Sequence, residues 1–464
     1  MQNINLEHPE FVAKKAMWSR YRDLYVGGEQ LKANASTYLT PRQKEPAPVY
    51  EERLSKVFYE NYVGSIIDWY AATLFRREPV IHIEGVSESG RKFFNAFTED
   101  CDLKGTALSD VFRRVILDAL VYGSGYLLAD FPKVNRPVET RAEEEAYGAS
   151  RAYLVEVSPE SIINWSLDER GSYEWVVIRN TTITKATVEA TEWQEETRWL
   201  YYDKQQYRVY RLRKGGSSKA EPELIDSGTH GFAKQNRVPL FEMKVLDGLW
   251  LMNKAGLLQL EHFNKSNALS WALTLGLFAQ PVIYSDRPFN QVVGESYYIQ
   301  LAPGDRFGWT EPAGNVFQIA SDNLGRLQEE IYRVCYMMNQ AGGASSSAPQ
   351  SALSKLRDFA ITQEVLRAYG DVVKDGMRRV LRAIEAARED NLAIDVSGLD
   401  EFDIGDFSTE LDDAVKLLAL NIDSVTFKKQ LFQRLAAKYL CDVRQDVKDR
   451  IAQEIEAGVL DSRK

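Results

Sequence analysis

The longest regular pattern in the sequence is a stripe of apolar residues at helical spacing across residues 352–388. Because residues three and four positions apart share one face of a helix, the stripe predicts a long amphipathic helix. A shorter stripe predicts a second helix, which would begin at Ser321 as its N-cap and present a seam to a helical partner. The two stripes consist of Leu324, Leu327, Ile331, Val334 and Met338, and of Leu356, Phe359, Leu366, Val373, Met377, Val380 and Ile384.

Short strand-like runs replace the helical period between residues 153 and 244. Gly and Pro separate these runs, which are rich in Val, Ile, Tyr and Trp, as in a β-rich module. The expected strands are 154–157, 174–179, 199–202 and 207–212.

Helices are expected on both sides of this β-rich part. Upstream they cover residues 8–25, 53–75 and 110–121, followed by a strand at 126–131; downstream they cover 253–278, 409–420 and 425–458. Residues 280–312 read as an insertion of loops and short strands, and 342–349 as a flexible Gly/Ser connector. The fold class is therefore α+β, mostly α-helical.

The composition limits the classes of function. The chain has 464 residues with 57 Lys and Arg against 67 Asp and Glu, a net charge of −10. Tight binding of nucleic acid over the whole surface needs a dense basic field, so only a local basic stripe remains possible. Three distant cysteines without a C-x-x-C motif favour reduced thiols in a cytosolic setting. We expect neither secretion nor a membrane span, because no signal-like N-terminus or long apolar run occurs.

The usual motifs of catalysis do not occur in the sequence. No phosphate-binding glycine loop, nucleophile elbow or zinc-protease motif is present, and the four histidines lie far apart. Adjacent carboxylates such as Asp412 and Asp413 are typical of solvated helix faces. We therefore expect no enzyme activity, no cofactor and no metal site.

The order of the elements resembles that of tailed-bacteriophage portal proteins, the head-to-tail connectors. The resemblance depends on residues 53–62 leading to 74–81, on 118–128, and on the strand motif at 157–165. Residues 260–275, 323–337 and 351–357 follow in the same order, so that the resemblance covers nearly the whole chain.

The resemblance implies a ring of about twelve copies at one capsid vertex, through which double-stranded DNA passes during packaging and ejection. It also implies partners: the large terminase, a head-to-tail adaptor, and the major capsid and scaffold proteins. The expected location is the virion, with the host cytoplasm during assembly. DNA would be contacted without sequence specificity, and no membrane would be involved.

The resemblance also divides the chain into wing, stem, clip and crown. Residues 1–150 would be an N-terminal helical wing region, 151–250 a β-rich wing module, and 251–317 the stem, clip and tunnel loop. Within this last segment 257–278 would be stem, 279–305 clip and 304–314 tunnel loop. Residues 318–341 would run from the tunnel into the wing, 342–351 would be a flexible loop, and 352–464 wing, crown and tail. Such proteins usually have two stem helices, and the sequence shows no second long helix before Ser321.

Five residues are candidates for the lining of a DNA channel. Lys254, Lys265, Arg306 and Arg326 could contact phosphates if they face the lumen, and the alternative is solvated surface or ion pairs between subunits. Trp309 could stack on nucleic acid or anchor a core or interface. Two other functions stay open: another head–tail or minor capsid scaffold protein, and a Mg²⁺-dependent enzyme acting on nucleic acid.

Overall fold

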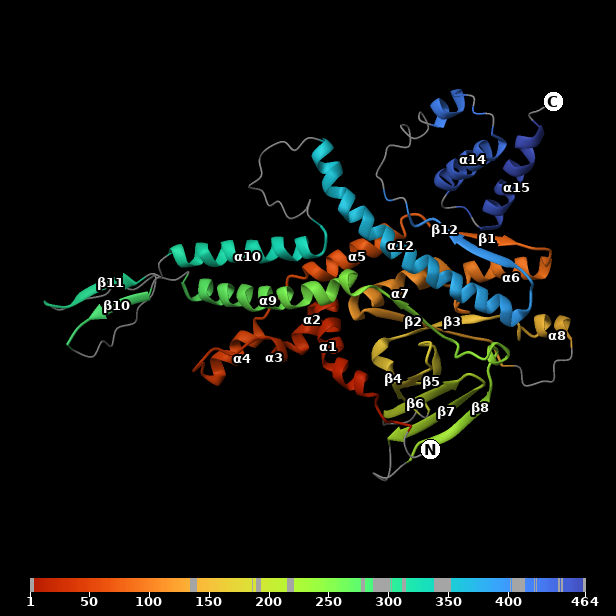
Figure 1. Cartoon of the computed structure of the whole chain (residues 1–464). Coiled ribbons are helices and arrows are strands. Elements are labelled where there is room, and N and C mark those ends of the chain that lie inside the picture. The colour runs from red at the N-terminus through yellow and green to blue at the C-terminus, as the bar shows by residue number, and fades with distance from the viewer. Residues whose placement is uncertain are drawn as a thin grey trace. The chain divides into compact units, whose positions relative to one another are not determined.

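The structure is a computed structural model that forms two compact units (Figure 1). One unit comprises Met1–Arg22, Ser65–Asn253 and Leu356–Lys464, and the other Asp23–Gly64 and Lys254–Lys355. The described residues are 4–133, 140–185, 187–188, 193–214, 221–276, 280–286, 301, 303–310, 314–337, 352–400, 402, 414–420, 422, 424–440, 443 and 445–461.

The first unit combines helices with three antiparallel sheets. Its helices include α6 (Glu88–Glu99), α7 (Leu108–Tyr122), α8 (Arg141–Ala146), α12 (Ala352–Arg388), α14 (Val425–Tyr439) and α15 (Gln445–Asp461), together with most of α1 (Pro9–Val26) and α5 (Tyr62–Leu74). The predicted stripe of α12 is buried from Leu366 to Ile384, and Leu366, Val373 and Met377 have no exposed surface. The mixed helix and strand content confirms the expected combination of helices and strands.

The strands of the first unit lie where the alternation predicted them, with additions. A five-stranded meander runs β4 (Ile162–Leu167), β5 (Tyr173–Thr184), β6 (Gln194–Asp203), β7 (Gln206–Lys214) and β8 (Glu223–Thr229). A second sheet has the order β3 (Tyr153–Val157), β2 (Ser124–Asp130) and β9 (Leu240–Lys244), and β1 (Val80–Glu84) pairs with β12 (Ala393–Ser397). Val176, Ile178 and Tyr202 are buried in one core cluster of the meander.

The second unit contains two long helices and several short ones. The long helices are α10 (Gly314–Val334) and α9 (Leu251–Gly276), and most of α9 lies in this unit. The strands are β10 (Gln280–Tyr284) and β11 (Arg306–Thr310). The short helices are α2 (Gly28–Ala33), α3 (Ala35–Tyr38) and α4 (Ala47–Ser55). The buried carboxylate of Asp23 accepts hydrogen bonds from Gln30 at 2.9 Å, Asn34 at 3.0 Å and the Tyr38 hydroxyl at 2.7 Å. These bonds hold α2 and α3 around one carboxylate.

The helix expected from Ser321 begins instead at Gly314. Its first turns carry Val316 and Ile319, which are 63% and 67% exposed, so no buried stripe marks this part of the helix. The segment 304–314, expected to be a loop, contains strand β11.

Two other helices were predicted as too long. The stretch 53–75 is interrupted between α4 and α5, where the backbone N–H groups of residues 58, 62 and 63 donate to side chains of α9. The N–H of Tyr62 also donates to the Glu60 carbonyl at 3.2 Å. The stretch 425–458 is divided into α14 and α15. The connector 342–349 and the start of the expected helix at 409–413 lie outside the described residues.

Candidate functional site

The helices α9 and α10 pair in opposite directions. Near the start of α9, Lys254 donates a hydrogen bond to the hydroxyl of Tyr336 and lies 4.3 Å from the centre of its ring. Eleven positions along the sequence from Lys254, Lys265 Nζ lies 3.0 Å from Oδ1 of Asn323. A later residue of α9 therefore meets an earlier residue of the returning segment, as an antiparallel helix pair requires.

The strands between these two helices continue the same pairing. Gln280 lies opposite Thr310 and Tyr284 opposite Arg306 in the antiparallel pair β10–β11. In chain order the segment is helix, strand, strand, helix, and its two halves pair along their length (Figure 1). We call α9, β10, β11 and α10 together the long hairpin.

Buried amide side chains hold α9 against the N-terminal part of the same unit. Gln259 is fully buried and accepts the N–H groups of Tyr62 and Val63, each at 3.2 Å, while donating to the Glu60 carbonyl at 2.7 Å. Asn264 and Asn267 bond in the same way to the backbone around Tyr38 and at Phe58. These bonds fix the base of the long hairpin, and the sequence analysis did not identify their amides.

Both candidate lysines on α9 already have protein partners. Lys254 is partly buried against Tyr336, and Lys265 pairs with Glu261 at 3.0 Å as well as with Asn323. Contacts within one chain therefore engage both ammonium groups.

The other three candidates lie on β11 and α10. Arg306 is exposed on β11 and Arg326 is exposed on α10, one turn beyond Asn323; within the described part of the chain, no residue pairs with either guanidinium. Trp309 lies on β11 opposite Pro281, and its side chain is outside the description. The structure thus brings Lys265 near the helical turn of Arg326 but does not gather all five residues.

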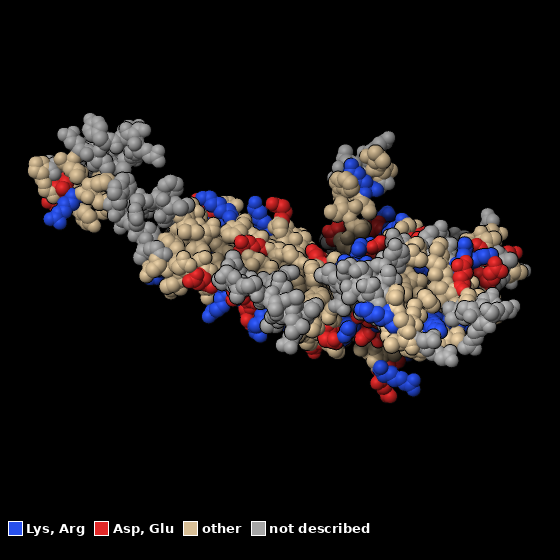
Figure 2. Space-filling model, turned by 90° about the horizontal axis from the view of Figure 1, so that it is seen from above, with Lys and Arg blue, Asp and Glu red and all other residues tan. Residues whose placement is uncertain are grey.

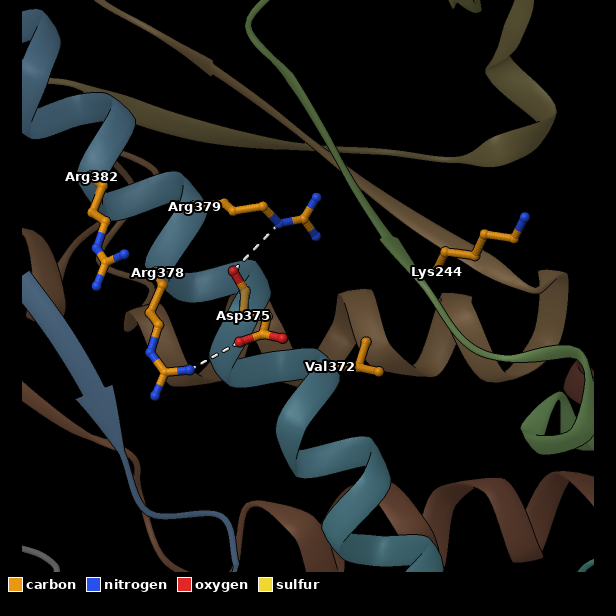
Figure 3. Close-up of a pocket in the computed structure, with 6 residues that line it drawn as sticks. All are labelled: Lys244, Val372, Asp375, Arg378, Arg379 and Arg382. Atoms are coloured by element: carbon orange, nitrogen blue, oxygen red, sulfur yellow. Dashed lines mark hydrogen bonds and ion pairs between the residues drawn. The ribbon is translucent and has the colours of Figure 1, made fainter. Parts of the chain in front are cut away.

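A separate cationic pocket lies in the first unit. Figure 3 shows the residues that line a cavity of about 380 Å³: Lys244 at the end of β9, and Val372, Asp375, Arg378, Arg379 and Arg382 of α12. Arg379 extends towards β9, whereas Arg378 and Arg382 extend towards β12. The spacing Arg378-Arg379-x-x-Arg382 was the only local signal for it in the sequence, and the sequence analysis missed it.

Backbone carbonyls of two sheets hold the arginines of this pocket. Arg379 Nη2 donates to the Glu242 carbonyl of β9 at 2.7 Å, and Arg382 Nε to the Ile394 carbonyl of β12 at 3.0 Å. Arg378 bonds Asp395 at 2.6 Å and Asp375 at 2.9 Å. Burial, together with the charge of Arg379, lowers the pKa of the neighbouring Arg237. One helix thus places several cations between two sheet edges.

The histidines do not form a catalytic group. His8 stacks on Trp165 at 4.1 Å, His230 bonds the Asp203 carbonyl at 2.8 Å, and His262 lies 3.6 Å from Glu60. Burial lowers the pKa of His262, although Glu60 opposes the shift. Across the residues that the structure describes, no group of three His, Cys, Asp or Glu side chains is arranged to hold a metal ion.

Surface charge of both signs is interspersed on the face seen in Figure 2. Lys and Arg alternate with Asp and Glu there and with large areas of other residues. No helix in the described part of the chain is long and apolar enough to cross a membrane.

Comparisons with known proteins found similarity to chains of gene transfer agent particles. A chain from the neck of an empty particle, computed with C6 symmetry, is 15% identical with a TM-score of 0.46 and covers 80% of this chain and 90% of that one. A chain from the virion of the native particle is 14% identical with a TM-score of 0.44, and the match covers 86% of this chain and 96% of that one. A chain from the native neck, computed with C12 symmetry, is 13% identical with a TM-score of 0.38, and the match covers 86% of this chain and 95% of that one. No protein-family model and no curated protein matches the chain.

Proposed function

We propose that this chain is a structural subunit of the head–tail region of a phage-like particle, and within that class a portal protein that conducts double-stranded DNA. The observation that carries the proposal is the long hairpin. A portal was expected to have two stem helices around a clip, and the sequence showed no second long helix before Ser321. Helix α10 begins at Gly314, directly after the insertion, and supplies a helix of 21 residues in that place.

In this proposal α9 and α10 form the stem, and the residues between them form the clip. Strand β11 occupies the residues for which a tunnel loop was expected, so that part of the earlier division is replaced. The clip would be the surface that docks the large terminase and later the head-to-tail adaptor. The location would be a capsid vertex.

Exposed apolar side chains on the long hairpin support assembly into a ring. Leu273 in the last turn of α9 is 38% exposed, and Val316 and Ile319 in the first turns of α10 are more exposed still. Contact with a second copy of the hairpin would remove them from water, at about 25 cal/mol for each Å² of apolar surface. We therefore assign this end of the hairpin to the contact between neighbouring subunits.

The charges suit a conduit rather than a sequence reader. A ring of chains that each carry a net charge of −10 repels DNA phosphates on average, so DNA would slide through the ring rather than adhere to it. Arg306 and Arg326 remain the channel candidates whose guanidinium groups have no partner among the described residues.

Negative-stain microscopy of the purified full chain tests this function. Rings of about twelve subunits with a central channel wide enough for a DNA duplex are expected. A stable monomer at high concentration, with and without scaffold protein, would contradict the portal assignment. Metal-dependent nuclease activity that is lost on changing one Asp or Glu would favour the enzyme alternative.

A further inference from the structure

The cationic pocket on α12 holds more positive charge than its described neighbours neutralise. Four cations and one carboxylate line it. Both nearby carboxylates, Asp375 and Asp395, bond Arg378, and Arg382 lies 3.6 Å from Asp395. Arg379 donates only to backbone carbonyls in the described contacts, and Lys244 has no partner among the described residues. The concentration of charge stands out in a chain of net charge −10.

The guanidinium groups are positioned before any ligand arrives. Neutral carbonyls of Glu242 and Ile394 hold Arg379 and Arg382, and of these two arginines only Arg382 also lies near a carboxylate of the described residues, that of Asp395. Each guanidinium has five N–H donors, and these bonds leave several unused. A fixed fork of donors matches the oxygens of a phosphate group, which arginine can bind through two hydrogen bonds at once.

The lining also indicates what the pocket would not read. Val372 is its one apolar member, and the lining residues include no aromatic ring and no amide. Stacking on bases needs an aromatic side chain, and a peptide partner needs apolar anchors. Charge recognition of oxyanions, phosphate or carboxylate, is the chemistry that remains.

We propose that the pocket of Lys244, Arg379 and Arg382 binds phosphate groups, and that these are backbone phosphates of double-stranded DNA contacted without regard to sequence. The identity of the nucleic acid depends on the proposed function, whereas the phosphate chemistry depends on the pocket alone. A free polyphosphate shares this chemistry and is separated from DNA by the experiment below.

The experiment measures binding of a short fluorescent duplex of random sequence to the full chain over a range of salt concentrations. Arg379→Gln/Arg382→Gln is expected to weaken binding about tenfold and to lower the slope of log K against log salt by about two, since each phosphate contact contributes about 0.9. The control Arg333→Gln/Arg367→Gln removes two exposed helical arginines outside the pocket and should change affinity less than about twofold.

A second variant avoids the risk of misfolding. Arg379 and Arg382 also bond to strands, so their loss can destabilise the fold; Lys244→Gln breaks no described contact and should lower the salt slope by about one. Equal binding by the wild type, Lys244→Gln and the double variant would overturn the proposal.

Competition identifies the ligand, and the assembly state separates the two proposals. Displacement of the duplex by sodium tripolyphosphate, but not by polyglutamate of equal charge, would support phosphate recognition, and equal displacement by polyglutamate would overturn it. Pocket-dependent binding of tripolyphosphate without any of duplex would overturn the assignment to DNA. Intact rings with no pocket effect would refute this inference alone, whereas pocket-dependent binding by a chain that never forms rings would refute the portal function alone.

Discussion

Gln259 and Val63 are joined by a buried hydrogen bond of 3.2 Å from the Val63 N–H to the Gln259 side-chain oxygen. The same oxygen accepts the N–H of Tyr62, and the amide nitrogen donates to the carbonyl of Glu60. One side chain thus satisfies three backbone groups at the start of α5, where the helix itself offers no partner.

Gln259→Leu should therefore destabilise the chain by about 3 kcal/mol, because it leaves buried backbone groups without hydrogen bonds. Urea unfolding of the wild type and the variant measures the loss. Gln318→Leu, at an exposed position of α10, is the control and should change the midpoint little. Equal midpoints for Gln259→Leu and the wild type would contradict the role of this amide.

Two helical glycines should respond to alanine in opposite directions. A methyl group at Gly370 of α12 would collide with the backbone oxygen of Leu399, whereas one at Gly325 of α10 meets no atom within 4 Å. Gly325→Ala should stabilise by about 0.5–1 kcal/mol through helix propensity, and Gly370→Ala should destabilise by about 1–3 kcal/mol through overpacking. Thermal unfolding of the two variants measures the sign of each change in stability. Stabilisation by Gly370→Ala would show that α12 and Leu399 are not in contact.

Stability should depend on the protonation of Asp118. Burial, with the charges of Glu156 and Glu160, raises the pKa of Asp118 from 3.8 to about 7 in the folded chain. The folded state then binds the proton more tightly than the unfolded state, so this group favours folding at low pH and the contribution is lost as pH rises from about 4 to 7. Asp118→Asn should raise the melting temperature at pH 8 relative to the wild type, and much less at pH 5.

Asp110→Asn on the same helix is the control for this pH dependence. Its carboxylate pairs with Arg113 at 2.7 Å near the surface, so its loss should leave the difference between pH 5 and pH 8 unchanged. A wild-type pH profile that persists in Asp118→Asn would assign the dependence to other groups.

The thiols of Cys101 and Cys335 should be inert in the folded chain. Both side chains are fully buried, and burial raises the pKa of each thiol to about 12. The thiolate is the reactive species, so iodoacetamide at pH 8 should modify neither residue until denaturant is added. Mass spectrometry of digested protein locates the label, and rapid native modification of either cysteine would contradict the burial.

Elements with their own buried stripe could be predicted from the sequence. Helix α12 spans residues 352–388 as expected, because Leu366, Val373 and Ile384 are buried along one face. The break between α4 and α5 could not be predicted, since the N–H of Phe58 bonds Asn267, 209 residues further along the chain. The pairing of β1 with β12 likewise joins segments on opposite sides of most of the sequence.

In the candidate site, too, local features could be predicted from the sequence and contacts between distant residues could not. Cations can be counted in a sequence, but their partners cannot: Lys254 and Lys265 are engaged by Tyr336 and Asn323 from the returning segment. The pocket on α12 joins a helical run of arginines to Lys244, which lies more than a hundred positions earlier. Only the arginine run could have been recognised locally.

The most direct test of the central claim is the mass of the assembly formed by the wild type and by Val316→Asp/Ile319→Asp. The control Val86→Asp/Ile183→Asp introduces the same charge at exposed positions that are not part of the long hairpin. A ring of about twelve chains is predicted for the wild type and the control, and smaller species for the hairpin variant, because buried unpaired carboxylates are costly at an interface. Identical ring masses for all three proteins would show that the long hairpin does not form the contact between subunits.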